Sequence, residues 1–130
     1  MAKQSPFVQK IIHLATIEAQ KDQRILALYL LGSAAEDRLR SDSDIDIALM
    51  ATPGEPLSSI EHADFAHALI YALRRPVDVG SLSLRNLVFA NEALLRGFRI
   101  YSRDIDATDL YAANLLGLYL EFNESRKEAR

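Results

Sequence analysis

Five residues of this sequence have types and spacing that could support chemistry. They are a glycine–serine pair and three aspartates. Gly32 and Ser33 follow one apolar run, and Asp44 and Asp46 head a second run ten residues later. Asp78 lies inside a third apolar run. A glycine lets a ligand come close to the backbone, and carboxylates hold hard divalent cations. The pattern indicates a phosphate-and-metal site.

The glycine–serine pair has two interpretations. Gly32 permits a sharp turn, and Ser33 then begins a helix whose free N–H groups would attract phosphate. The alternative is that Ser33 to Glu36 form a capping box, which needs no ligand. The dipeptide taken by itself favours the cap, so the phosphate interpretation depends on the acids that follow.

The Asp-Ile-Asp segment predicts two carboxylates on one face of a strand. Alternate side chains of a strand share a face, so Asp44 and Asp46 point the same way while Ile45 faces the core. Carboxylates about 7 Å apart along a strand can bridge a pair of hard cations. The alternative is a solvated strand edge that continues the polar loop before it.

Asp78 is the third candidate because it stands between Val77 and Val79 in a short apolar strand. A charged residue there is costly unless it is paired or binds a metal. If this strand lies beside the strand of the other two aspartates, three carboxylates converge, as two-metal phosphoryl or nucleotidyl transfer requires. The alternative is a salt bridge from Asp78 to Arg74 or Arg75.

Apolar periodicity and turn signals predict the elements that must position these residues. The expected strands are residues 25–31, 45–50, 77–82 and 98–102, the last of them edge-like. The expected helices are residues 6–21, 33–39, 57–75, 84–96 and a last one that starts at Asp106 or Thr108 and fades into the charged tail. This order predicts an α/β (α+β) fold with a small mixed sheet packed with helices.

Size and charge limit the possible functions. A chain of 130 residues favours a single domain, residues 1–130. Fifteen basic against eighteen acidic residues, with a net charge of −3, argue against a long nucleic acid as the main partner. The chain has no cysteine, the N-terminus has no signal-peptide pattern, and no apolar run could span a bilayer. We expect a cytoplasmic protein that does not engage a membrane.

The joint pattern of strand, Gly-Ser, ten residues, Asp-x-Asp strand, helix and lone-Asp strand resembles a known family. "GSAAEDRLRSDSDID" and "VDVG" are similar to the signature of the minimal nucleotidyltransferases of the DNA polymerase β superfamily. The resemblance covers roughly residues 25–102 and implies a polymerase-β-like nucleotidyltransferase fold. Within the family, the chain looks most like the MntA-type antitoxins, single-domain proteins that are paired with a HEPN ribonuclease toxin.

The resemblance implies an activity with ATP as substrate and magnesium, two ions, as cofactor. AMP would be transferred to a tyrosine of the HEPN toxin in a hetero-oligomer, which silences the toxin. By position, Gly32 and Ser33 would hold the triphosphate, and Asp44 and Asp46 would bind the metals. Asp78 would help to bind metal and would take the tyrosine proton before the hydroxyl attacks the α-phosphate and pyrophosphate leaves.

The chain departs from the family pattern at one place. Many relatives have Arg-Gly where this sequence has Glu36-Asp37, so a basic residue that could help to bind the phosphates is missing there. Arg38 or Arg40 could substitute for it, or the acids could only cap the helix. The departure concerns nucleotide affinity and leaves the metal-binding aspartates in place.

Two other functions fit the sequence less well. A small-molecule nucleotidyltransferase usually adds a helical acceptor domain, and few residues remain after Ser102 to build one. A non-catalytic binding antitoxin would have lost its carboxylates, yet all three are present.

The last helix of the chain could contribute to a partner surface. Most of its large residues are expected in the core and part of them at a partner surface. These residues are Leu110, Tyr111, Leu115, Leu118, Tyr119 and Phe122.

Overall fold

A four-stranded sheet organises the computed structural model, which describes residues 4–36, 40 and 43–128 of the chain. Its strands are β1 (Ile25–Leu31), β2 (Ile45–Ala51), β3 (Val77–Leu82) and β4 (Phe98–Ser102). The strand order is β3-β2-β1-β4, with β2 and β3 parallel and the other neighbours antiparallel. The predicted mixed sheet is confirmed, and β4 is an edge strand as expected.

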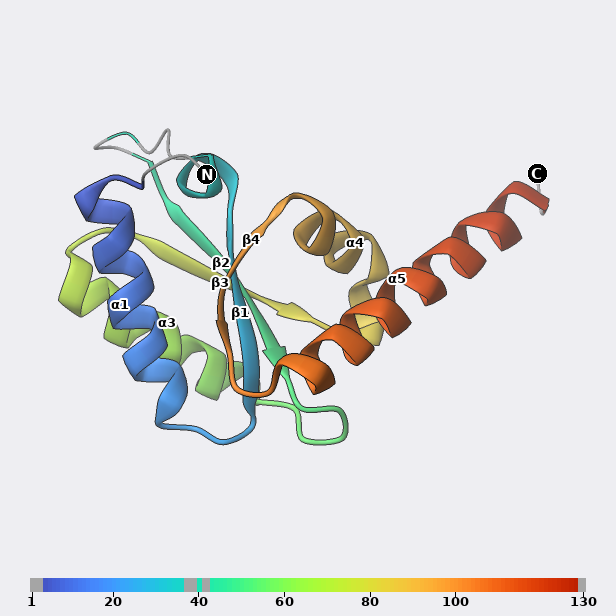
Figure 1. Cartoon of the computed structure of the whole chain (residues 1–130), viewed down its shortest axis with the longest axis horizontal. Helices are drawn as coiled ribbons and strands as arrows, with labels where there is room; N and C mark the ends of the chain where they lie inside the picture. Colours follow the sequence, from blue (N-terminus) through green and yellow to red (C-terminus); the bar gives the residue numbers. More distant parts are fainter. Residues whose placement is uncertain (1–3, 37–39, 41–42, 129–130) are drawn as a thin grey trace.

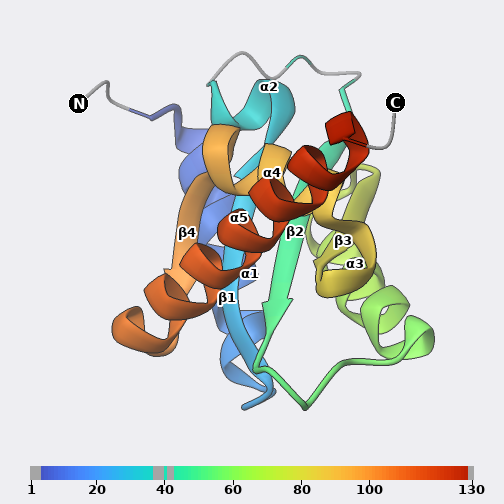
Figure 2. The same ribbon diagram turned by 90° about the vertical axis from the view of Figure 1, so that its right-hand side faces the viewer.

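Helices cover both faces of this sheet. They are α1 (Pro6–Gln20), α2 (Gly32–Ala35), α3 (Ser59–Leu73), α4 (Leu87–Arg96) and α5 (Ile105–Glu128), with a 3₁₀ turn η1 (Leu84–Asn86) before α4. In Figure 1, α1 and α3 lie on one side of the sheet and α4 and α5 on the other. Figure 2 turns the molecule so that α4 and α5 stand in front of the strands.

The alternation of side chains along β2 divides the interior into two cores. Ile45 and Ile47 are buried in the core under α1 and α3. Ala48 and Met50 are buried in the core under α4 and α5. Because alternate residues share a face, Asp46 belongs to the face that α4 and α5 cover. This face therefore carries the candidate chemistry.

Local capping explains where the helices begin. The Ser5 hydroxyl accepts a hydrogen bond of 3.2 Å from the Val8 N–H, which starts α1. Ser58 and Glu61 form a reciprocal capping box, so α3 begins at Ser59 and not at the predicted residue 57. The same helix ends before Arg74, whose left-handed conformation (φ 58°) stops it short of the predicted residue 75.

The last helix differs most from its prediction. It starts at Ile105 and continues through the charged tail to Glu128 because Glu, Lys and Arg are good helix formers. Leu115 is buried as expected, but Leu110 is 66% exposed and Phe122 41% exposed, so the expectation that most large residues of this helix are core is wrong. Figure 1 shows that the C-terminal half of α5, the half to which Phe122 belongs, projects beyond the sheet. Among the described residues, no helix has the length and apolarity to cross a membrane.

Candidate active site

The glycine–serine pair forms the start of α2, immediately after β1 ends. Leu31 is the N-cap residue of this helix and makes no side-chain capping hydrogen bond. Ser33 is therefore the second residue inside the helix, and the capping box that the sequence allowed for Ser33 to Glu36 is wrong. Gly32 has a φ of 62°, a left-handed conformation that glycine adopts without strain. This turn starts the helix one residue earlier than predicted.

The short helix also ends early, at Ala35 rather than at residue 39. Glu36 is its C-cap residue. Arg38, a candidate to replace the missing family arginine, lies together with Asp37 outside the described residues. Arg40, the other candidate, is placed, and its backbone N–H donates a hydrogen bond of 3.2 Å to the Ser43 hydroxyl.

Strand register brings the other candidates to the same end of the sheet. Asp46 of β2 stands opposite Leu31 of β1 on one side and opposite Asp78 of β3 on the other. The strand that carries Asp78 thus lies beside the strand that carries Asp46. This is the condition under which the sequence predicted that the carboxylates converge. A Cβ built on Gly32 would lie 3.5 Å from Oδ2 of Asp46. The absence of a side chain at Gly32 therefore leaves one side of this carboxylate open.

The three carboxylates differ in exposure. Asp46 is half-buried, whereas Asp44, one residue before β2, and Asp78 are exposed. Burial raises the pKa of Asp46, and the negative charges of Asp78 and Asp44 raise it further. The other two carboxylates therefore act electrostatically on Asp46. The site concentrates negative charge at the point where β1 ends and β2 begins.

The described arginines do not neutralise this charge. In the part of the chain that the structure describes, none of the three carboxylates forms an ion pair. The alternative in which Asp78 pairs with Arg74 or Arg75 is thus wrong. Arg74 lies over the Tyr71 ring, with its guanidinium carbon 5.0 Å from the ring centroid. Arg75 is turned toward backbone carbonyl oxygens instead.

A divalent cation fits the chemistry of this site. Within residues 4–36, 40 and 43–128, no three acidic or histidine side chains form a ready-made ligand group. Nevertheless, carboxylate oxygens are the donors that Mg²⁺ prefers, and Asp46 carries a raised pKa that a nearby cation would lower. The open side of Asp46 next to Gly32 gives room for a ligand.

One packing contact near the site was not anticipated from the sequence. A Cβ on Gly80, two residues after Asp78 in β3, would lie 2.6 Å from the Phe89 ring. Phe89 of α4 therefore packs directly on the strand, on the face that carries Asp78. The sequence did contain an indication of this contact, namely Gly80 itself. An isolated glycine inside a strand indicates that another group approaches the backbone closely.

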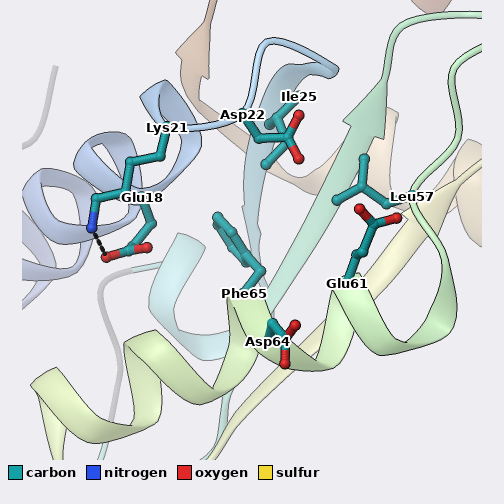
Figure 3. A pocket seen from close by; sticks show the side chains of 8 residues that line it. All are labelled: Glu18, Lys21, Asp22, Ile25, Leu57, Glu61, Asp64 and Phe65. Carbon is teal, nitrogen blue, oxygen red and sulfur yellow. Dashed lines mark hydrogen bonds and ion pairs between the residues drawn. The ribbon is translucent and has the colours of Figure 1, made fainter.

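A separate pocket of about 250 Å³ lies near the opposite end of β1, where this strand begins at Ile25 (Figure 3). Its lining residues are Glu18, Lys21, Asp22, Ile25, Leu57, Glu61, Asp64 and Phe65. Arg24 donates hydrogen bonds to both Asp22 and Glu61, and this pairing lowers the pKa of Glu61 to about 2. These two acids are thus paired within the chain, in contrast to the aspartates at the other end of the sheet.

Comparisons with known proteins identify relatives of this chain. The family model described as polymerase beta, nucleotidyltransferase matches residues 9–106. The chain is 29% identical over 118 residues to the protein adenylyltransferase MntA of Shewanella oneidensis strain MR-1, and the match spans 91% of this chain and 81% of that protein.

Two solved structures have a similar fold. A toxin–antitoxin crystal structure with AMP-PNP has a TM-score of 0.72 at 23% identity, over 95% of this chain and 92% of that chain. A complex of the tri-AMPylated HEPN toxin of Shewanella oneidensis with its MNT antitoxin has a TM-score of 0.69 at 24% identity, over the same shares, 95% and 92%. The fold implied by the sequence signature is therefore confirmed.

Proposed function

This chain belongs to the polymerase β nucleotidyltransferase family, and we propose that it is an antitoxin that transfers AMP from ATP to a tyrosine of a cognate HEPN ribonuclease toxin. The observation that supports the proposal is the sheet register, which sets Asp46 opposite Asp78, two residues after Asp44 and beside the open backbone of Gly32. The similar MntA of Shewanella oneidensis is a protein adenylyltransferase. The two similar complexes contain an ATP analogue and an AMPylated toxin, respectively.

The proposed reaction assigns a role to each carboxylate. Asp44 and Asp46 hold two magnesium ions, and Asp78 helps to hold them and accepts the proton of the tyrosine hydroxyl. Bound magnesium would offset the negative charge of the phosphates and of the carboxylates. The tyrosine oxygen forms a bond to the α-phosphorus, the bond from this phosphorus to the bridging oxygen breaks, and pyrophosphate leaves. The exposure of Asp78 supports its role, because an acceptor on another protein can reach it.

The proposed triphosphate site is formed by Gly32 and Ser33. The left-handed turn at Gly32 places backbone without a side chain next to Asp46, so phosphate oxygens and a carboxylate-bound cation could share this space. Ser33 is half-buried and offers its hydroxyl from the first turn of α2.

The proposed partner is a protein, and the exposed side of α5 supports this. Leu110, Leu118, Leu120 and Phe122 are between 39% and 66% exposed along this helix. Large apolar residues are costly in water, so the projecting helix offers contact surface for the toxin in a hetero-oligomer. We infer that the complex acts in the cytoplasm, where ATP is available, without a long nucleic acid or a membrane as partner.

The test is intact-mass spectrometry of the toxin after co-expression with this chain. We expect a mass gain of one or more AMP units with the wild type and none with Asp44→Asn or Asp46→Asn. Asp64→Asn is the matched control, because Asp64 is exposed on α3 and lines the pocket at the other end of β1. A toxin that stays unmodified in a tight complex with the wild type would instead support a non-catalytic antitoxin.

A further inference from the structure

Arg75 is the residue that joins the end of α3 to the segment in front of Asp44. Its Nη2 atom donates hydrogen bonds to the backbone carbonyl oxygens of both Arg40 and Ser43. Its guanidinium carbon also lies 5.0 Å from the centroid of the Phe7 ring of α1. One planar cation therefore connects three parts of the chain that are far apart in sequence.

Arg40 and Ser43, which carry these two carbonyl groups, also form hydrogen bonds with each other. The Ser43 N–H donates to the Arg40 carbonyl oxygen at 3.1 Å, and the Arg40 N–H donates to the Ser43 hydroxyl at 3.2 Å. Asp44 follows Ser43 directly, and the next residue, Ile45, donates its N–H to the Pro76 carbonyl oxygen at 3.0 Å. The backbone is therefore held on both sides of Asp44, in each case by the Arg75-Pro76 dipeptide.

This arrangement matters because Asp44 lies just outside the regular sheet. Its side chain is exposed, and β2 starts only at the next residue. A carboxylate that binds a cation must be held within about 0.5 Å of the productive position, and the groups behind a ligand commonly provide this precision. Here the supporting groups are backbone carbonyls held by a guanidinium.

We propose that Arg75 is a positioning residue for the metal-binding carboxylate of Asp44, which it fixes through the carbonyl groups of Arg40 and Ser43. The inference rests on the proposed function, because it presupposes that Asp44 holds a divalent cation. Lysine is a poor substitute for Arg75 in this role. Nη2 serves both carbonyl groups while the planar guanidinium lies over the Phe7 ring, and an ammonium group has no planar face that could stack on this ring as it donates.

Arg74 offers a matched control. It is the adjacent arginine, it is exposed, and its side chain contacts only the Tyr71 ring among the contacts that the structure describes. Arg74→Lys and Arg75→Lys keep the same net charge. A difference between the two variants therefore reports the guanidinium contacts of Arg75 rather than charge at the end of α3.

The experiment measures Mn²⁺ binding to the purified full-length chain by electron paramagnetic resonance, in the presence of AMP-PNP. In parallel, amide hydrogen exchange of Ile45 is followed in the metal-free protein, and AMP transfer is titrated with Mg²⁺. We expect Arg75→Lys to weaken Mn²⁺ binding about tenfold, to raise the Mg²⁺ requirement by a similar factor and to speed exchange at Ile45. Arg74→Lys should match the wild type in all three.

The outcomes separate this inference from the proposed function. An active wild type whose Arg75→Lys and Arg74→Lys variants bind Mn²⁺ equally well would overturn the role of Arg75 alone. A stability loss in Arg75→Lys with unchanged Mn²⁺ affinity would make it a purely structural residue and would also overturn the inference. A wild type that neither binds Mn²⁺ nor transfers AMP would overturn the proposed function together with it.

Discussion

Replacement of Gly32 by alanine tests the candidate site through a single methyl group. The φ of 62° at this position puts an L-residue in the left-handed region, which costs roughly 1–2 kcal/mol. The added Cβ would meet Oδ2 of Asp46 at 3.5 Å, an ordinary contact, so steric overlap adds nothing to this cost. We expect the thermal midpoint of unfolding to fall by roughly 3 to 10 °C, with the fold retained.

The loss of activity should be much larger than the loss of stability. The new methyl group closes the open side of the Asp46 carboxylate, where the proposed function places the cation and the triphosphate. A displacement of about 1 Å in a reacting group can cost about 100-fold in rate. We therefore expect AMP transfer to the toxin, measured as initial rate by intact-mass spectrometry, to fall about 100-fold at saturating ATP.

Gly54→Ala is the control for backbone strain. Gly54 also has a positive φ, of 85°, but a Cβ there would have nothing within 4 Å. It lies in the connection after β2, at the end of this strand away from Asp46. The control should lose stability to a similar degree and keep its activity. If Gly32→Ala transfers AMP as fast as Gly54→Ala, the reasoning about the open carboxylate is refuted.

Three further predictions concern charge and packing. Because the folded pKa of Asp46 is raised above its ordinary value, its ionisation opposes folding as the pH rises through that interval. Asp46→Asn should therefore raise the thermal midpoint of the metal-free protein at pH 7 and abolish any further rise on addition of Mg²⁺. The pKa of Glu61, about 2, lies below its ordinary value because of Arg24, so its contribution to stability is present above that ordinary value and is lost as the pH falls toward 2. Glu61→Gln should show a shallower loss of stability over this acid interval in pH-dependent urea unfolding. Gly80→Ala forces a Cβ to within 2.6 Å of Phe89 and should cost about 1–3 kcal/mol, part of which Phe89→Leu in the same chain should restore, as urea unfolding of both variants would show.

The strands were predictable because their signals are local. An apolar run stopped by Gly32 fixed the bounds of β1, and Pro76 marked the start of β3. The alternation of side chains along a strand is enough to predict that Asp46 and Ile45 point to opposite faces of the sheet. The residues of the candidate site could therefore be named from short-range patterns, which are visible in the sequence.

Other features depended on contacts between distant segments. The parallel pairing of β2 with β3, which sets Asp46 opposite Asp78, cannot be read from either strand alone. The side chain of Arg75 could have met Asp78, and only the folded chain shows it at backbone carbonyls. Ser33 fitted a capping box locally, but the left-handed turn at Gly32 begins the helix one residue before it.

The two ends of β1 differ in how far their negative charge is offset within the fold, and this difference supports the site proposed at the Asp46 end. At the other end of β1, Arg24 forms ion pairs with both Asp22 and Glu61, so part of their negative charge is offset within the fold. At the Asp46 end, burial and two neighbouring carboxylates oppose ionisation, and none of the described arginines or lysines pairs with these acids. The folded chain therefore carries an electrostatic cost that a cation from solution can relieve. Since a triphosphate brings its own divalent cations, nucleotide binding would remove this cost. It would do so beside Asp78, which is exposed and thus accessible to the proposed acceptor on another protein.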